Sequence, residues 1–485
     1  KQKFNCLIVD VVLNHMSNDS PITKSHPESF YNLENRPHLK PAFLVDRALY
    51  YLTIGLVKTN GSKSKILSVN EIKKINSVLK NGVLSRVRII EFYVVDIEKT
   101  IKKFANYIES KKYTLIKHSN CEINIIQDKK YRRLGCKIDL DCAFNKYLSN
   151  LTKINSQSFD SACVKLREQI KDLNQQKYIY VQGILDDIVN SSNGHIFYHF
   201  LDPNGPKQNF ISAENPLISR YFSICCQDYV ESSIENDEIL MNSADCKYIL
   251  ANQGWVVGSP TFDFVSPESE VYVRRQLIAW ADCAKIRWGN CRSDAPFIWD
   301  YMEKYVISMA NCFDGFRIDN CHSTPIHVLE YLIDSSRKIN PNLILIGELF
   351  TDSELEDNLF VNRVGLTCLI RERMSATSLT QLCHMVHRFG GTPIGSFFEN
   401  QSSCVKVKPA VTRAMLTDMT HDNECLFIKY SPYEYLPSCA FVAMASCSIG
   451  SVRGFDEIVP YQVYKSVNLF FRLMSLASQN YTPHG

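Results

Sequence analysis

The sequence predicts an α/β fold in which parallel strands alternate with helices, and two short segments and their spacing support this prediction. GFRIDNCHS (315–323) and IGELF (346–350) each read as a buried apolar strand that ends in a carboxylate, Asp319 in the first and Glu348 in the second. The acids are 29 residues apart, close to the roughly 30 residues of one strand–helix–strand repeat. This spacing places both at the same end of neighbouring parallel strands, which in a (β/α) barrel is the end that carries catalytic residues.

The residues between the two acids fit one such repeat. Ser323 or Thr324 is a candidate N-cap for a helix, and Pro325 suits its first turn. The dipeptide at 340–341, Asn-Pro, should end the helix, and LILIG (343–347) then reads as a fully buried strand. The helix itself is indicated by apolar residues at helical spacing: Ile326, Leu329, Leu332 and Ile333.

The segments before Asp319 predict a helix and a strand. An apolar stripe over 297–309 indicates a helix, and CFDGFRID (312–319) indicates the strand that follows it. Arg317 and Asp319 are two residues apart on this strand, so their side chains point to the same face. A guanidinium at that position can hold the carboxylate ionised and oriented.

Two further strand ends carry polar residues. AMLTDMTHDNE (414–424) reads as a strand that runs into a polar cluster, with Asp422 next to His421 and 74 residues after Glu348. That distance leaves room for two repeats and a longer loop, so the three acids should end strands n, n+1 and n+3. Far upstream, CLIVDVVLNH (6–15) is an apolar strand interrupted by Asp10, and it ends in Asn14 and His15.

The chain is too long between the first strand and Asp319 for a simple barrel. His15 and Asp319 are 304 residues apart, where one repeat needs about 30. We therefore expect residues 1–15 to hold one barrel strand, an α+β insertion to span 16–265, and residues 266–485 to form the rest of the catalytic barrel. Within the insertion the sequence predicts a strand over 86–96, a helix over 97–110, one or two helices over 160–190 and a loop over 232–238. The apolar stretch at 436–452 is interrupted by Ser, Cys and Gly, so we interpret it as a buried strand plus turn rather than a membrane span.

Composition argues against several other classes of protein. The net charge is +3 over 485 residues, and the basic run at 128–137 comes with no nucleic-acid motif, so we expect neither a nucleic-acid nor a membrane partner. The 18 cysteines are scattered and form no C-x-x-C pair, which favours reduced thiols in a cytoplasmic protein. The pairs His195/His199 and His384/His387 have no clustered third ligand, so we expect no metal.

The four strand ends together carry a family resemblance. DVVLNH, GFRIDNCHS, IGELF and MTHDNE occur in the order of the four motifs of the alpha-amylase superfamily of glycoside hydrolases and transferases, which the chain resembles. Longer strings, among them HPESFYNLENRPHLKPA, NQGWVVG, IRERMSA and SVRGFDEIVP, look like the glucanotransferase region of the eukaryotic glycogen debranching enzymes. The resemblance covers about residues 10–460. It implies a (β/α)8 TIM-type barrel that starts here at its third strand, so we expect an N-terminally truncated barrel whose first two strands, like the family's C-terminal glucosidase region, lie outside this sequence.

The resemblance also implies roles for individual residues. Asp319 would be the nucleophile of a retaining double displacement, and Glu348 would be the general acid and then the base, with the two carboxyls about 5–5.5 Å apart. Asp422 would steady the oxocarbenium-like transition state. The remaining implied contacts to the sugar or the nucleophile come from Asn14, His15, Arg317, His322 and His421. Glycogen and maltooligosaccharides would be the substrates, and no cofactor is implied.

Three functions stay open at the level of sequence. The first is a 4-alpha-glucanotransferase of glycogen breakdown, the second a hydrolytic amylase with water as acceptor, and the third a non-catalytic glucan-binding or scaffold protein. The third is disfavoured because all three carboxylates and Arg317 are present. Transfer and hydrolysis differ in how the acceptor site excludes water, and neither that choice nor the oligomeric state follows from the residues.

Overall fold

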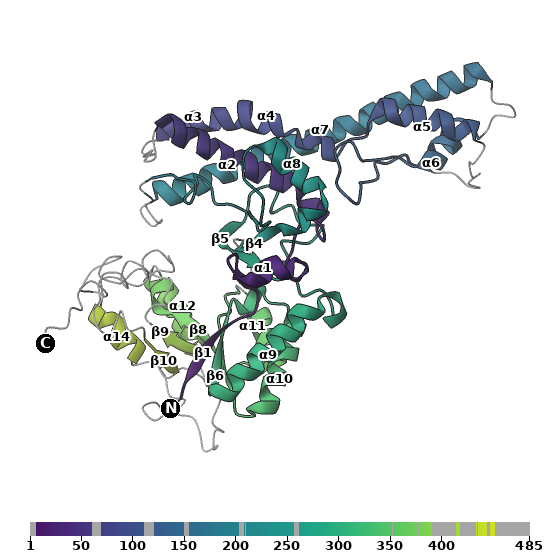
Figure 1. Ribbon diagram of the computed structural model, residues 1–485. Coiled ribbons are helices and arrows are strands. Elements are labelled where there is room, and N and C mark those ends of the chain that lie inside the picture. Colours follow the sequence, from purple (N-terminus) through teal and green to yellow (C-terminus); the bar gives the residue numbers. More distant parts are fainter. Residues whose placement is uncertain are drawn as a thin grey trace. The chain divides into compact units, whose positions relative to one another are not determined.

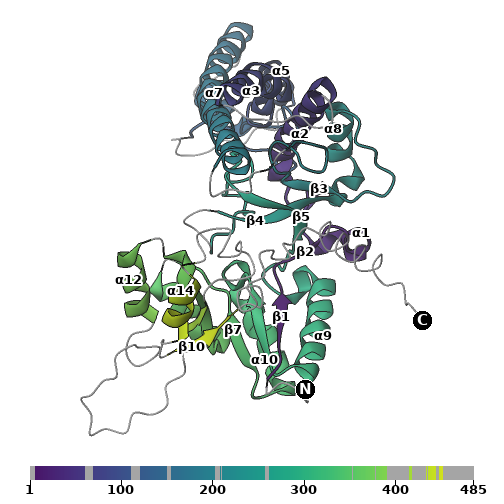
Figure 2. The ribbon, with the colours of Figure 1, turned by 90° about the vertical axis from the view of Figure 1, so that its left-hand side faces the viewer.

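The computed structural model describes residues 6–60, 69–110, 121–149, 155–202, 208, 210–256, 261–351, 353–376, 378–389, 414–417, 433, 435–443 and 447–451. The chain divides into two compact units, and each is described by itself. Unit 1 comprises residues 1–14 and 300–485, and unit 2 comprises residues 15–299. Figures 1 and 2 show the ribbon in two views at right angles.

Unit 1 contains a parallel sheet whose six described strands follow the order β1-β6-β7-β8-β9-β10. Every neighbouring pair in this sheet is parallel. The bounds are Ile8–Val12 for β1, Gly315–Asp319 for β6, Ile344–Gly347 for β7, Cys368–Glu372 for β8, Ala414–Thr417 for β9 and Ser448–Gly450 for β10. The predicted parallel α/β arrangement is confirmed, whereas closure into an eight-stranded barrel stays a prediction.

Helices alternate with these strands (Figure 1). Their bounds are Pro296–Cys312 for α9, Ile326–Ile339 for α10, Glu354–Phe360 for α11, Leu379–Phe389 for α12 and Tyr435–Ala443 for α14. Of the predicted apolar stripe of α10, Leu329, Leu332 and Ile333 are buried and Ile326 is partly buried. The sequence order β6-α10-β7 confirms the predicted repeat between the two acids. Strand β9 lies two places beyond β7 in the sheet, as the n, n+1, n+3 spacing predicts.

The predicted cap of α10 is wrong. The residue at the N-cap is Pro325, and no side chain caps the helix. Ser323 instead belongs to a 3-10 turn and donates from its hydroxyl to the Asn320 carbonyl. The local sequence offers two hydroxyls before Pro325, but both are used by the loop that follows β6.

Unit 2 is built on an antiparallel sheet with helices beside it. The sheet order is β2-β5-β4-β3, with bounds His15–Ser17 for β2, Phe222–Ile224 for β3, Ile249–Trp255 for β4 and Ile278–Lys285 for β5. The helices are α1 (Pro21–Ser25), α2 (Lys40–Asn60), α3 (Val69–Val78), α4 (Leu84–Val87), α5 (Ile97–Glu109), α6 (Leu140–Tyr147), α7 (Ser156–Phe200) and α8 (Ile234–Asn242). Helix α5 lies along the 45-residue helix α7 in both views (Figures 1 and 2).

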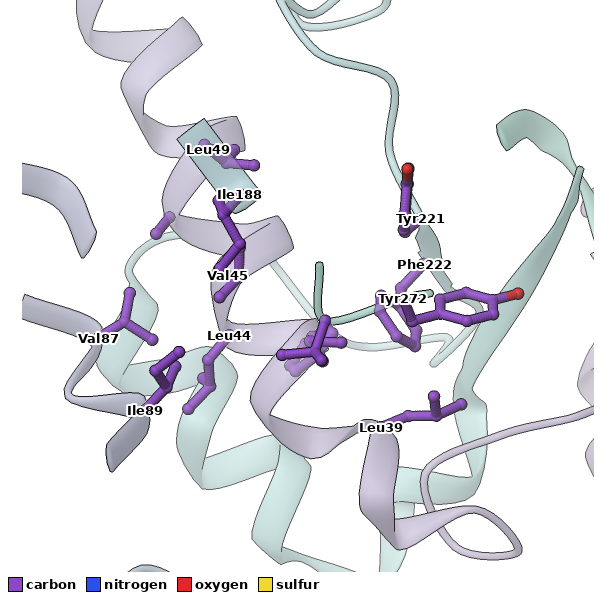
Figure 3. Close-up of a cluster of buried hydrophobic side chains, with 14 of the residues drawn as sticks. Leu39, Leu44, Val45, Leu49, Val87, Ile89, Ile188, Tyr221, Phe222 and Tyr272 are labelled. Atoms are coloured by element: carbon purple, nitrogen blue, oxygen red, sulfur yellow. The ribbon is translucent and has the colours of Figure 1, made fainter. Parts of the chain in front are cut away.

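The main core of unit 2 joins helix α2 to the sheet. Leu44 and Val45 of α2, Phe222 of β3 and Tyr272 are buried together in one apolar cluster. Figure 3 shows these side chains with Ile188 of α7. Long-range packing of this kind holds residues 15–299 together as a compact unit, because burial of apolar area supplies most of the driving force.

Several predictions inside unit 2 can be compared with these elements. The helices over 97–110 and 160–190 are confirmed, the second as part of one continuous helix. The strand over 86–96 is wrong, because Arg88 has left-handed backbone (φ 48°) after α4 and residues Ile89–Phe92 then form a 3-10 turn. The loop over 232–238 is also wrong, because Ser233 caps α8.

In unit 1 the apolar stretch at 436–452 contains α14 and then β10, not a single strand plus turn. Continuous apolar runs do not distinguish helix from strand, since both can be buried on all sides. Among the described residues, no helix combines the length and apolarity that a membrane crossing requires.

Most described cysteines are free thiols, as the sequence predicts, but two are not. Cys121 and Cys142 form a disulfide in unit 2. Fourteen other described cysteines form no disulfide, and Cys136, Cys225, Cys246, Cys321 and Cys368 are buried. The disulfide was not signalled by the sequence because the two residues are 21 positions apart and in no recognisable motif.

Candidate active site

The carboxyl ends of β6 and β7 bring the two predicted acids together. Asp319 is the last residue of β6, and Glu348 follows β7 directly. The strand pairing continues beyond the named strands, since Glu348 donates from its backbone N–H to the Ile318 carbonyl over 3.0 Å. Both acids are almost fully buried, with exposed fractions of 5% for Asp319 and 7% for Glu348.

The guanidinium of Arg317 holds three carboxylates. Its Nη1 atom lies 2.5 Å from Asp319 Oδ1 and 2.9 Å from Asp10 Oδ1, and its Nη2 atom lies 2.8 Å from Glu348 Oε1. Arg317 and Asp10 are directly opposite each other on β6 and β1, which places both side chains on one face of the sheet. Burial alone would lower the pKa of Arg317, but the charges of Glu348, Asp10 and Asp319 outweigh it and raise that pKa. Arg317 therefore stays charged and fixes where the two predicted catalytic carboxylates sit.

Asn320 forms a second bridge between the same two acids. Its backbone N–H donates to Glu348 Oε2 over 2.7 Å, and its side-chain amide donates to Asp319 Oδ2 over 3.0 Å. This geometry requires a left-handed backbone at Asn320 (φ 45°), which asparagine tolerates better than most residues. Each carboxylate thus has one oxygen on Arg317 and the other on Asn320.

Asn14 and His322 lie in the loops beside this cluster. The Asn14 side chain is 2% exposed and donates to Ser323 Oγ over 2.5 Å, so it supports the loop after β6. His322 lies in that loop, and its ring centroid is 6.4 Å from that of Phe350. Cys321, the residue before His322, is fully buried. This burial together with the charge of Glu348 raises the pKa of its thiol.

Three predicted site residues are not part of the described cluster. His15 begins β2 and belongs to unit 2, where its ring contacts Trp280 at 5.4 Å between centroids. Asp422 and His421 lie outside the described residues, although the strand that precedes them, β9, is in the predicted place.

Sequence reasoning missed two members of the cluster. Asp10 was recognised only as an interruption of an apolar strand, because its contact with Arg317 depends on the pairing of β1 with β6 across 307 positions of the chain. Asn320 carried no signal, since a residue's left-handed backbone is not visible in its type alone. Polar residues inside an otherwise apolar strand were the available sign for Asp10.

The cluster has the equipment for acid–base and nucleophilic chemistry on a glycosidic bond. The two carboxylates lie together at the ends of β6 and β7, and a double displacement uses a pair of carboxyl groups at one site. Among the described residues, no group of three or more His, Cys, Asp or Glu side chains is arranged so that it could hold a metal ion. His195 and His199 instead line a cavity of about 400 Å³ in unit 2, beside Arg275.

Comparison with known proteins shows the family of the chain. Residues 1–344 match the family described as glycogen debranching enzyme, glucanotransferase domain. The chain belongs to this family. Asp10, Asn14, Arg317, Asp319 and Asn320 all lie within the matched residues, whereas Glu348 follows just after them.

A relative from Saccharomyces cerevisiae (strain ATCC 204508 / S288c), named glycogen debranching enzyme, extends the match through Glu348 and beyond. It is 33% identical over 504 aligned residues, which cover 94% of this chain and 32% of the relative. The chain therefore spans about a third of the length of the relative that it matches.

Two solved alpha-amylases are more distant. The crystal structure of an Anoxybacillus alpha-amylase is 13% identical and covers 37% of this chain and 39% of its own, with a TM-score of 0.29. That of an alpha-amylase from Lactobacillus plantarum is 13% identical and covers 38% and 43%, also with a TM-score of 0.29. Likenesses at this level transfer neither fold nor function.

Proposed function

We propose that this chain carries the 4-alpha-glucanotransferase activity of glycogen debranching, in which short maltooligosaccharide units move between alpha-1,4-glucan chains. One observation carries the proposal: in a chain of this family, Asp319 and Glu348 share the guanidinium of Arg317. A non-catalytic scaffold would gain nothing from this cluster. Buried charges carry a desolvation cost, whereas apolar side chains at the same positions would not.

The proposed reaction has two displacements. In the first, Asp319 attacks the anomeric carbon, the bond to the glycosidic oxygen breaks, and Glu348 gives its proton to that oxygen. A covalent glycosyl-enzyme forms and the shortened glucan leaves. In the second, the 4-hydroxyl of another glucan attacks the same carbon, Glu348 takes up its proton, and Asp319 is released.

The remaining proposed site residues act on the nucleophile or on the sugar. Arg317 keeps Asp319 ionised and in place, which favours attack by its oxygen. Asp422 would steady the positive charge that develops on the sugar ring. The side chains assigned to hydroxyl contacts or to the wall of the site are Asn14, His15, His322 and His421.

Product analysis with the full-length protein tests transfer against hydrolysis. Maltopentaose should be converted to longer and shorter chains, while the total of reducing ends stays constant. A rise in reducing ends equal to the substrate consumed would show that water is the acceptor and that the chain acts as an amylase.

The organisation of the chain is part of the proposal. We propose that residues 16–265 are an insertion that follows the barrel strand of residues 1–15, and that residues 266–485 complete the catalytic barrel. Support comes from unit 2, since its strands β3 and β4 and its helices α1–α8 all lie within the proposed insertion, whereas its strand β5 lies beyond residue 265. The proposed barrel closure would be tested by an experimental structure of the full-length protein.

We propose a cytoplasmic location for the same activity. The support is that fourteen of the sixteen described cysteines form no disulfide, since thiols persist in reducing compartments. Fractionation of cells that produce the full-length protein would test this, and recovery in a secretory fraction would overturn it.

A further inference from the structure

A buried arginine on β8 contacts the backbone next to the proposed general acid. Arg371 is 6% exposed, and its Nη1 atom donates to the carbonyl of Leu349 over 2.8 Å. Leu349 is the residue directly after Glu348. This hydrogen bond links Arg371 to the backbone beside the proposed acid.

An ion pair fixes the guanidinium of Arg371. Its Nη2 atom donates to Asp357 Oδ2 over 3.0 Å, and both side chains are 7% exposed. Asp357 lies on α11, a helix that Ser353 caps, and its other oxygen accepts a hydrogen bond from the Thr351 hydroxyl over 2.6 Å. The segment after Glu348 is thereby held at two places, the Leu349 carbonyl and the Thr351 side chain.

Glu348 is anchored on its other side by β6. Its backbone N–H donates to the Ile318 carbonyl, and its carbonyl accepts from the N–H of Cys321, each over 3.0 Å. The Arg371–Asp357 pair completes this support from β8 and α11. A displacement of about 1 Å at a reacting group can cost on the order of 10²-fold in rate, so support of this kind has a measurable consequence.

We propose that Arg371, oriented by Asp357, is a positioning residue that aims the Glu348 carboxyl at the glycosidic oxygen. This inference rests on the proposed function, because it takes Glu348 as the general acid. An arginine suits the task better than a lysine, since its planar fork can donate to the Leu349 carbonyl and to Asp357 at the same time. A buried ion pair is costly to desolvate, and a positioning role gives a reason to keep one here.

The test compares two substrates in the full-length protein. Cleavage of maltopentaose requires a proton from the acid, whereas α-maltosyl fluoride has a leaving group that departs without one. Because kcat/KM reports the first displacement, a misplaced acid lowers it for maltopentaose and spares the fluoride. Arg371→Met should lower kcat/KM on maltopentaose by on the order of 10- to 100-fold and leave the fluoride within about 3-fold. The kcat/KM of Arg371→Lys on maltopentaose should lie between the values of Arg371→Met and of the parent protein.

Arg337 provides a matched control in the same unit. It also donates to backbone carbonyls, those of Val364 over 2.9 Å and Gly365 over 2.7 Å, but these precede β8 and lie away from Glu348 in the chain. Arg337→Met should change kcat/KM by the same factor on maltopentaose and on the fluoride. If Arg371→Met does not fold, Thr351→Val removes one hydrogen bond of the same support and should show a smaller loss with the same preference for the fluoride.

Two outcomes would overturn the proposal. One is an equal loss on both substrates for Arg371→Met and Thr351→Val, and the other is no loss on either. Glu348→Gln separates this failure from that of the proposed function. If Glu348→Gln spares the fluoride and the Arg371 variants do not, the positioning role alone is wrong. If Glu348→Gln loses activity equally on both substrates, the assignment of the acid is wrong and the positioning proposal fails with it.

Discussion

The Nη2 atom of Arg317 lies 2.8 Å from Oε1 of Glu348, while Nη1 of the same guanidinium contacts Asp319. One side chain thus sets the separation and the orientation of the two proposed catalytic carboxylates. Because a guanidinium is rigid and planar, this control over geometry would be lost with any flexible replacement.

Arg317→Lys should therefore lower kcat/KM on maltopentaose by on the order of 10²-fold or more, although the charge is kept. A lysine can approach one carboxylate but cannot hold two with fixed geometry. The control is Arg363→Lys, which affects an exposed ion pair with Glu330 in the same unit and should be near neutral. Full activity of Arg317→Lys would mean that the shared guanidinium does not organise the site.

Asn320 allows backbone and side-chain effects to be separated. Asn320→Gly keeps the left-handed backbone accessible but removes the amide that donates to Asp319. Asn320→Ala removes the same amide and adds strain, at a cost of roughly 1 kcal/mol. Both variants should lose activity to a similar extent, and the alanine variant should unfold at the lower temperature. Equal melting temperatures would contradict the assigned backbone conformation.

Two partly buried histidines of unit 2 predict how stability depends on pH. Burial, helped by Arg36, lowers the pKa of His38 to about 4, and burial, helped by Arg275, lowers that of His195 to about 4. Between pH 6.5 and 4 the unfolded chain therefore binds more protons than the folded one, so stability is lost as the pH falls. Each histidine should lower the free energy of unfolding by roughly 2 kcal/mol as the pH falls from 7 to 5.

Unfolding curves at pH 7 and pH 5 check this expectation. The loss of stability between the two pH values should be smaller in His38→Gln and in His195→Gln than in the parent, because glutamine does not titrate. A pH dependence unchanged in both variants would show that neither histidine is held neutral in the folded chain.

The sequence allowed the strands that carry the acids to be predicted because their signals are local. Asp319 and Glu348 each follow a short apolar run, and the helix between them has a regular apolar stripe. The contact of Arg317 with Asp319 followed from their spacing on one strand. The contact with Asp10 could not be foreseen, since it depends on which strand pairs with β6.

The insertion was harder to predict for a physical reason. Residues 86–96 are rich in apolar and aromatic side chains, which favour a strand by composition, yet Ile89 and Phe92 are buried at the three-residue spacing of a 3-10 turn. Tertiary burial outweighs local preference there. The support of Glu348 by Arg371 and Asp357 was equally invisible, because it joins a side chain of β8 to a carboxylate of α11 and to the backbone carbonyl of Leu349.

Whether Asp319 is the nucleophile can be tested by trapping the covalent intermediate in the full-length protein. A 5-fluoro-α-maltosyl fluoride slows both displacements but keeps the reactive leaving group, so a retaining enzyme accumulates its glycosyl-enzyme. Mass spectrometry of the digested protein should find the sugar on the peptide that contains Asp319, and Asp319→Asn should abolish the label together with transfer activity, a loss of more than about 10³-fold. A label on another carboxylate, or transfer activity that survives in Asp319→Asn, would contradict the assignment of Asp319 as nucleophile.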